Sequence, residues 1–256
     1  MGHSIALAPD KASHPETVVR VVNVLPQLTN IKRMALDLLF PRWCVGCGKE
    51  GDLLCQSCCQ SLPRIVPPLC PRCGKPQLSG ILCPSCVGWQ TEIEGIRSPF
   101  QFEGVIRQAI HQLKYRNLRA VVVPLASLLM DYLTTNPIPG EVLVPVPLHK
   151  KRLKERGYNQ SYLLARELGR LAGLSVVDDC LIRQRHTPPQ ARASSVEERR
   201  SNAADAFTCC NHKLRGKQVV LIDDVATSGA TLDACDSALK AAGASSVWGL
   251  VLATEV

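Results

Sequence analysis

Aromatic side chains are scarce in this sequence, and long apolar runs are missing. Aromatic residues make up 4% of the 256 residues, which argues against a nucleic-acid surface built mainly on base stacking. No segment reaches the roughly 18 consecutive apolar residues of a membrane-spanning helix, so we expect no membrane span. The start, MGHSIALAPDKASH, has neither a basic leader nor a sustained apolar core, and Ala6 breaks the myristoylation pattern. The sequence therefore predicts a cytoplasmic protein.

Two common phosphate-binding patterns, the Walker loop and the G-x-G-x-x-G fingerprint, are also absent. The composition is nevertheless that of a folded protein, with 46% hydrophobic and 20% charged residues. The formal net charge of +8 favours polyanionic partners such as nucleic acid, phosphorylated small molecules or acidic membrane surfaces. A basic soluble protein without such a partner would carry the same charge.

Cysteine is abundant and clustered: nine of the 13 cysteines lie between Cys44 and Cys86. This placement indicates metal binding in a reducing compartment rather than a disulfide framework. Eight of them form four C-x-x-C knuckles, at Cys44 and Cys47, Cys55 and Cys58, Cys70 and Cys73, and Cys83 and Cys86. Two knuckles supply the four sulfurs of a tetrahedral Zn²⁺ site, so we expect two structural zinc ions.

The spacing of the four knuckles is compatible with two ways of pairing them. Sequential pairing, first with second and third with fourth, leaves intervening loops of seven and nine residues and is the arrangement we expect. A cross-braced pairing has compatible spacing. A redox role for the C-x-x-C pairs is the weaker alternative, because four repeats of one knuckle suit a zinc ribbon better, and Cys59 has no predicted role.

Composition and residue pattern divide the chain into three predicted segments: an extension at residues 1–30, a helix plus a double zinc ribbon at 31–90, and an α/β domain at 91–256. In the last segment, apolar runs predict strands at 98–104, 141–147, 217–224 and 246–254. Helical periodicity predicts helices at 105–115, 120–133, 159–173 and 230–243, with Gly173 as a C-cap. Alternating strands and helices predict a parallel sheet with right-handed crossovers.

The run VVLIDDVATSGAT, residues 219–231, combines a buried strand with a polar end. In an open α/β sheet, ligands bind beyond the carboxyl ends of the strands, where Asp223 and Asp224 stand. Adjacent carboxylates repel each other unless they face hydroxyl donors or a cation, and a ribose diol and Mg²⁺ meet that requirement. The following loop can bind a 5′-phosphate through backbone N–H groups at a helix N-terminus. Its residues are Ala226, Thr227, Ser228, Gly229, Ala230 and Thr231.

The same run resembles the phosphoribosyl-pyrophosphate (PRPP) fingerprint of type I phosphoribosyltransferases. With the four knuckles and the segments LVPVPLHKKRLKERGYNQS, RQRHTPPQ and EERRSNAADAF, residues 36–256 resemble the ComF/GntX family. The resemblance implies a phosphoribosyltransferase-like parallel-sheet domain after a double zinc ribbon. It also implies that Asp223 and Asp224 hold the ribose hydroxyls and Mg²⁺, with the 226–231 loop on the 5′-phosphate. This chain has Ala226 and Ser228 where related fingerprints often carry bulkier residues or threonine.

Basic residues follow the strand at 141–147. The segment expected to contact pyrophosphate or DNA comprises Pro147, Leu148, His149, Lys150, Arg152 and Arg156. An ordinary solvated helix start is the alternative. Residues 157–160 could contact a base or cap the next helix. The polar stretch 183–202 resembles the mobile hood of phosphoribosyltransferases, or is a long surface loop in which His186 is a surface residue.

Three functions are compatible with these features. The leading hypothesis is a PRPP-binding protein for uptake or use of single-stranded DNA in competence and transformation, with a DNA-processing helicase or the uptake machinery as partner. The second is a true phosphoribosyltransferase acting on a small nucleophile or base, with zinc purely structural. The third is a nucleic-acid-binding adaptor with a non-catalytic nucleotide site, against which the intact acid pair argues.

Overall fold

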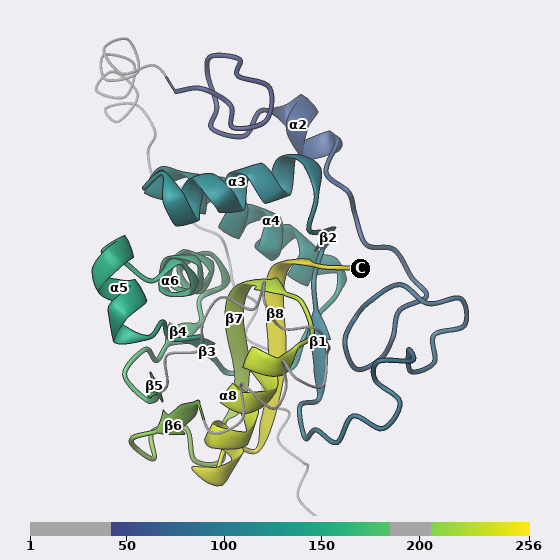
Figure 1. The fold of residues 1–256 in the computed structure, drawn as a ribbon, viewed down its shortest axis with the longest axis vertical. Helices are drawn as coiled ribbons and strands as arrows, with labels where there is room; N and C mark the ends of the chain where they lie inside the picture. Colours follow the sequence, from purple (N-terminus) through teal and green to yellow (C-terminus); the bar gives the residue numbers. More distant parts are fainter. Residues whose placement is uncertain (1–41, 185–205) are drawn as a thin grey trace, which may run out of the picture. The chain divides into compact units, whose positions relative to one another are not determined.

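The long apolar runs of the sequence form the centre of a parallel sheet. β7 (Gln218–Ala226) pairs with β8 (Ser246–Thr254) on one side and with β3 (Val142–Pro145) on the other. Shorter strands complete the sheet, with β4 (Ser175–Val176) beside β3, and β1 (Gly95–Arg97) and β2 (Phe100–Gln101) beside β8. Every pairing in this sheet is parallel. Figure 1 shows β7 and β8 as the longest strands.

Helices connect these strands, as the alternating pattern predicted. They are α3 (Gly104–Tyr115), α4 (Val122–Thr135), α5 (Lys150–Arg156), α6 (Gln160–Ala172) and α8 (Ala230–Ala241), with the short α2 (Gln56–Gln60) earlier in the chain. The ends of α6 illustrate the local causes: the Asn159 side chain accepts from Ser161 N at 3.0 Å, and Gly173 ends the helix with a φ of 69°. The predicted C-cap is therefore confirmed.

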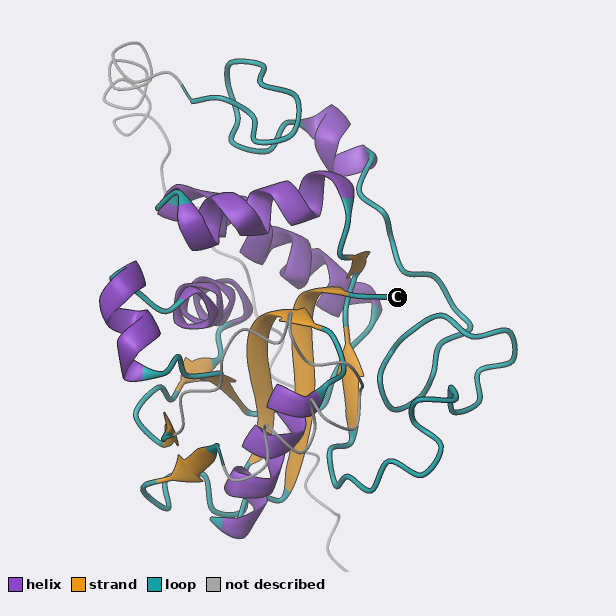
Figure 2. Ribbon diagram, in the orientation of Figure 1, coloured by secondary structure: helices purple, strands orange, loops and turns teal. Residues whose placement is uncertain are grey.

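The sheet is apolar on both faces, as a central parallel sheet must be. Val220 and Ile222 pack into one core cluster with α3, α4 and α6. Val219 and Leu221, which point the other way along the same strand, pack into a second cluster with α8. Helices therefore cover both sides of the strands, which are orange in Figure 2.

This computed structural model describes residues 42–184 and 206–256. Residues 42–256 belong to one structural unit. The predicted extension 1–30, the helix expected after residue 30 and most of the 183–202 stretch lie outside the described residues. Within the described part of the chain, no helix is long and apolar enough to cross a membrane.

The predicted fold class, a parallel-sheet α/β domain preceded by a zinc ribbon, is confirmed. Some element boundaries were wrong. The strand expected at 98–104 has only two residues, Phe100 and Gln101, and Gly104 already begins α3. A two-stranded antiparallel sheet of β5 (Leu181–Arg183) and β6 (Phe207–Cys209) was not predicted, because it joins short segments from either side of the polar stretch.

Candidate functional site

The eight knuckle cysteines form two four-sulfur clusters, and the pairing is sequential. One cluster comprises Cys44, Cys47, Cys55 and Cys58, and the other Cys70, Cys73, Cys83 and Cys86, with all four sulfurs of each within 4.8 Å of one another. The sulfurs of Cys47 and Cys55 are 3.6 Å apart, as are those of Cys73 and Cys83. Tetrahedral zinc with sulfur at about 2.3 Å separates its ligands by about 3.8 Å, so both clusters fit Zn²⁺.

Backbone N–H groups support the sulfurs in both clusters. Cys55 N donates to Cys44 Sγ at 3.4 Å, and Cys83 N donates to Cys70 Sγ at 3.5 Å. The neighbouring thiols of the first cluster differ in pKa. Hydrogen bonds from Ser57 and the Cys58 backbone lower the pKa of Cys55 to about 6. Burial and the neighbouring thiols raise the pKa of Cys58 to about 12. A bound divalent cation would coordinate all four sulfurs and stabilise them as thiolates, the role expected of a structural zinc.

The two clusters pack on opposite faces of the sheet. Cys44 and Cys58 belong to the core cluster of α3, α4 and α6. Cys70, Cys83 and Cys86 belong to the core cluster of α8. The ribbons are therefore integral to the two cores of this unit, and small modules of their size need such support because they bury little apolar surface themselves.

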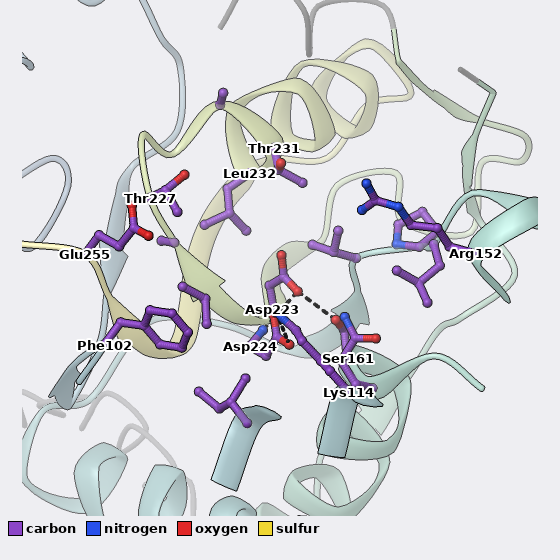
Figure 3. Close-up of a pocket in the computed structure, with 18 of the residues that line it drawn as sticks. Phe102, Lys114, Arg152, Ser161, Asp223, Asp224, Thr227, Thr231, Leu232 and Glu255 are labelled. Atoms are coloured by element: carbon purple, nitrogen blue, oxygen red, sulfur yellow. Dashed lines mark hydrogen bonds and ion pairs between the residues drawn. The ribbon is translucent and has the colours of Figure 1, made fainter. Parts of the chain in front are cut away.

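A cavity of about 550 Å³ opens beyond the carboxyl ends of β3 and β7 (Figure 3). Of the predicted site residues, those that line it are Pro147, Leu148, Arg152, Arg156, Asp223, Asp224, Ala226, Thr227, Gly229, Ala230 and Thr231. The parts that the sequence suggested for ribose, phosphate and pyrophosphate thus share one cavity. Its volume is within the range of about 300–1,000 Å³ that is typical of small-molecule sites.

Three predicted site residues do not line the cavity. Ser228 Oγ instead accepts from Ala230 N at 3.5 Å. His149 is the N-cap of α5 and accepts from Lys151 N through Nδ1 at 3.2 Å, and Lys150 begins this exposed helix. Of the two roles suggested for residues 157–160, capping is the one observed for Asn159, while Tyr158 is buried and donates its hydroxyl to Leu113 O.

The acid pair lies near the carboxyl end of β7, which continues to Ala226 rather than ending at Asp224 as predicted, and the pair is held by the protein itself. Ser161 Oγ donates to Asp223 Oδ1 at 2.7 Å, and Asp224 N donates to the same oxygen at 2.9 Å. Lys114 Nζ lies 2.8 Å from Asp224 Oδ2, and this carboxylate side chain is only 4% exposed (Figure 3). The hydroxyl donor and the cation that two adjacent carboxylates require are therefore Ser161 and Lys114.

These contacts give the two aspartates different surroundings. Burial, and then the Asp224 charge, raise the pKa of Asp223 to about 7 against the lowering effects of Lys114 and Ser161. Burial lowers the pKa of Lys114, but the Asp224 carboxylate more than reverses this and raises it above its usual value. Both aspartates line the cavity, but Asp224 is held in an ion pair with Lys114, whereas Asp223 has a raised pKa and a hydroxyl donor in place of a paired cation.

The loop after β7 turns into α8 at Gly229, whose φ of 79° favours glycine. The strand end is fixed from β8, since Thr254 Oγ1 and Glu255 N both donate to Ala226 O at 3.0 Å. The first backbone N–H groups of α8 have no partner in the preceding turn of the helix, so its N-terminus attracts an anion. Thr227 and Thr231 stand on this rim of the cavity.

Sequence reasoning missed several cavity residues on α3 and α6. The missed wall residues are Arg107, His111, Lys114, Tyr115 and Ser161, while Gln160 and Arg183, which also line the cavity, belong to segments that the sequence had suggested as ligand contacts. Arg107, His111 and Tyr115 are spaced four residues apart and so share one face of α3. No local motif marks Lys114. Ser161 lies two residues after the N-cap of α6, within the segment LVPVPLHKKRLKERGYNQS, but only the fold brings it to Asp223.

Comparison with known proteins adds three findings. A family model described as "Double zinc ribbon domain" matches residues 35–87. The chain is 30% identical to competence protein ComFC of Bacillus subtilis over 199 residues (72% of this chain, 76% of that protein), and 29% identical to the DNA utilization protein YhgH of Escherichia coli K12 over 197 residues (75% and 86%). A purine phosphoribosyltransferase from Pyrococcus horikoshii aligns with 55% of this chain and 75% of its own, at 18% identity and a TM-score of 0.31.

The fold and the site define a class: a parallel-sheet α/β protein that carries a double zinc ribbon. Its distinguishing features are two four-cysteine clusters and an acid pair that precedes a loop of small residues. Within that class, the chain belongs to the family of competence protein ComFC.

Proposed function

We propose that this protein binds PRPP, or another ligand with a ribose 5-phosphate group, in the cavity at the end of β7. One observation carries the proposal: the acid pair and the 226–231 loop meet in a single 550 Å³ cavity whose wall also holds arginines.

Each part of the ligand has a partner of suitable chemistry. Asp223, with one oxygen already held by Ser161, accepts from the ribose hydroxyls with the other. The phosphate binds at the N-terminus of α8. Arg152 and Arg156, on the wall contributed by α5, face the pyrophosphate, for which arginine is well suited.

Magnesium fits this site as a companion of the ligand. Mg²⁺ is usually held by one or two carboxylates together with substrate phosphates. Because Lys114 already pairs with Asp224, Asp223 is the carboxylate left to share the ion with the pyrophosphate. When bound, the ion would neutralise the pyrophosphate charge, and the residues of this chain would orient the sugar beneath it.

We further propose that the protein acts in the uptake or use of single-stranded DNA. Relatives at about 30% identity carry the names competence protein and DNA utilization protein. The net charge of +8 and the exposed basic helix α5 suit a phosphate backbone. With 4% aromatic residues, binding should be mainly electrostatic. A helicase or uptake component is the protein partner proposed.

The direct test is calorimetry with PRPP and Mg²⁺. Asp223→Asn should weaken binding at least tenfold, since a hydrogen bond from a ligand to a charged group contributes about 1.5–3 kcal/mol. Asp131→Asn, an exposed aspartate on α4, is the control and should bind as the wild type does. Unchanged PRPP affinity in Asp223→Asn would refute the ribose site.

The α3 wall favours one alternative, phosphoribosyl transfer to a small acceptor. His111 and Tyr115 are in ring contact with centroids 4.7 Å apart, and the Arg156 guanidinium lies 5.6 Å from the Tyr115 ring. Such a wall can stack on a flat base beside the sugar. Pyrophosphate release from PRPP, measured with and without candidate bases and single-stranded DNA, distinguishes turnover from binding alone.

A further inference from the structure

The chain segment that leaves the second cysteine cluster contacts the loop proposed for phosphate binding. Trp89 follows Cys86 by three residues and is only 5% exposed. It belongs to the core cluster of α8 and is not among the residues that line the cavity. The loop from Ala226 to Thr231 therefore has the cavity on one side and a tryptophan from the ribbon packed behind it.

Trp89 and Ile96 together enclose Gly229. A Cβ atom placed on Gly229 would lie 2.8 Å from Cη2 of the Trp89 indole and 2.9 Å from Cδ1 of Ile96, closer than real Cβ contacts. The indole edge therefore rests directly on the backbone at the start of α8. Two features of position 229 require a glycine: its φ is positive, and the contacts with Trp89 and Ile96 leave no room for a side chain.

Two hydrogen bonds attach the same segment to the first turn of α8. Trp89 Nε1 donates to Asp233 Oδ2 at 3.3 Å, and Thr91 Oγ1 donates to Asp233 Oδ1. Asp233 N in turn donates to Gly229 O at 3.0 Å, the first hydrogen bond of the helix. The ribbon segment thus fixes both the position and the direction of the helix N-terminus that faces the cavity.

This segment is connected to the cluster by backbone contacts. Trp89 N donates to Cys86 O at 3.2 Å. Arg72, which lies between Cys70 and Cys73, donates to the carbonyls of both Cys86 and Trp89. Arg72 O also accepts from Ile96 N at 2.7 Å. Both knuckles of the second cluster therefore hold the two residues that enclose Gly229.

We propose that the second cysteine cluster positions the phosphate loop, with Trp89 as the positioning residue, so that ligand affinity depends on this cluster. The inference rests on the proposed function of the cavity. The first cluster packs elsewhere: a Cβ on Gly46 would meet Val105 of α3 at 2.8 Å. The two clusters thus have different tasks, and only the second contacts the loop through the residues described here.

Three variants test the proposal in the full-length, zinc-loaded protein. Trp89→Ala removes the contact with Gly229, Trp89→Phe keeps an aromatic ring but loses the N–H donor, and Asp233→Ala removes the acceptor. Trp43→Ala is the matched control, because Trp43 belongs to the first ribbon and is 54% exposed. Zinc content, thermal stability, affinity for ribose 5-phosphate and amide hydrogen exchange at residues 226–231 are measured for each.

We expect Trp89→Phe to retain two zinc ions and to bind ribose 5-phosphate about threefold to tenfold more weakly, the effect of one lost hydrogen bond. Asp233→Ala, which loses the hydrogen bonds from both Trp89 and Thr91, should retain two zinc ions and weaken binding at least as much. Trp89→Ala should weaken binding further, with faster exchange in the loop, and Trp43→Ala should match the wild type. If Trp89→Phe and Asp233→Ala bind ribose 5-phosphate as the wild type does, with unchanged loop exchange, the inference is overturned. If the wild type binds neither ribose 5-phosphate nor PRPP, the proposed function fails instead, and the exchange data alone decide whether Trp89 holds the loop.

Discussion

Replacing Lys114 by methionine tests the most consequential contact of the site. Methionine keeps most of the apolar stem of lysine and removes only the charge. The Asp224 carboxylate, 4% exposed, then loses the ammonium 2.8 Å away. The change leaves a carboxylate buried beside Asp223 without its cation, which is the situation that folded proteins avoid.

The expected cost follows from the geometry. At 2.8 Å, an effective dielectric constant of about 20 corresponds to about 6 kcal/mol of gross attraction. Removing one partner of a buried pair typically costs about 3–5 kcal/mol. Because the Lys114 side chain is 20% exposed and water can partly replace it, the lower end applies. We therefore expect Lys114→Met to lower the free energy of unfolding by about 3 kcal/mol.

Urea unfolding measures this loss, and a double-mutant cycle attributes it. Asp224→Asn combined with Lys114→Met should recover most of the stability, because no buried charge is then left unpaired. The control is Lys213→Met, which breaks the exposed pair with Asp179 and should cost much less stability than Lys114→Met, because solvent screens exposed ion pairs. A loss in Lys114→Met no greater than in Lys213→Met, or no recovery in the double variant, would refute the reasoning.

Three further predictions concern Asp223, Gly229 and the two cysteine clusters. Burial raises the pKa of Asp223 from 3.8 to about 7, so this carboxyl stabilises the fold fully below about pH 4, and the stabilisation is lost as the pH rises through 7. Asp223→Asn should remove this pH-dependent component from urea unfolding measured across that range. An identical pH dependence in the variant would contradict the prediction. Gly229→Ala should destabilise the protein by about 1–3 kcal/mol or more, because the new Cβ atom strains a φ of 79° and meets Trp89. The control Gly48→Ala also has a positive φ, 69°, but its Cβ atom would meet nothing within 4 Å, so it should cost less in the same denaturation assay. Metal analysis should find two zinc ions per chain, and a strong chelator should lower the unfolding temperature; a single zinc would exclude one of the two clusters.

The local features of this protein could be predicted from the sequence because they depend on short spacing. A C-x-x-C knuckle places two sulfurs on one turn wherever it occurs, so four knuckles indicate two zinc sites. The apolar run before Asp223 predicts a buried parallel strand, and the carboxyl end of such a strand is where ligands bind. The cap at Gly173 follows from the conformational freedom of glycine.

The contacts of the site could not be predicted in the same way, because their partners are far apart in the chain. Lys114 and Asp224 are separated by 110 positions, and no pattern within α3 distinguishes Lys114 from a solvent-facing lysine. Two adjacent carboxylates need hydroxyl donors or a cation, and from the sequence both were expected to come from the ligand. In the structure Ser161 and Lys114 supply them first.

By itself, then, the sequence determined the sulfur ligands, the central strand and the acidic end of that strand, all of which follow from local chain geometry. The tertiary structure alone decided which charges compensate the acids, and that Trp89, from the segment after the second cluster, packs against the loop at Gly229. The physical reason is that burial and long-range packing determine which side chains meet. A carboxylate 4% exposed must find its partner within the fold, wherever that partner stands in the chain.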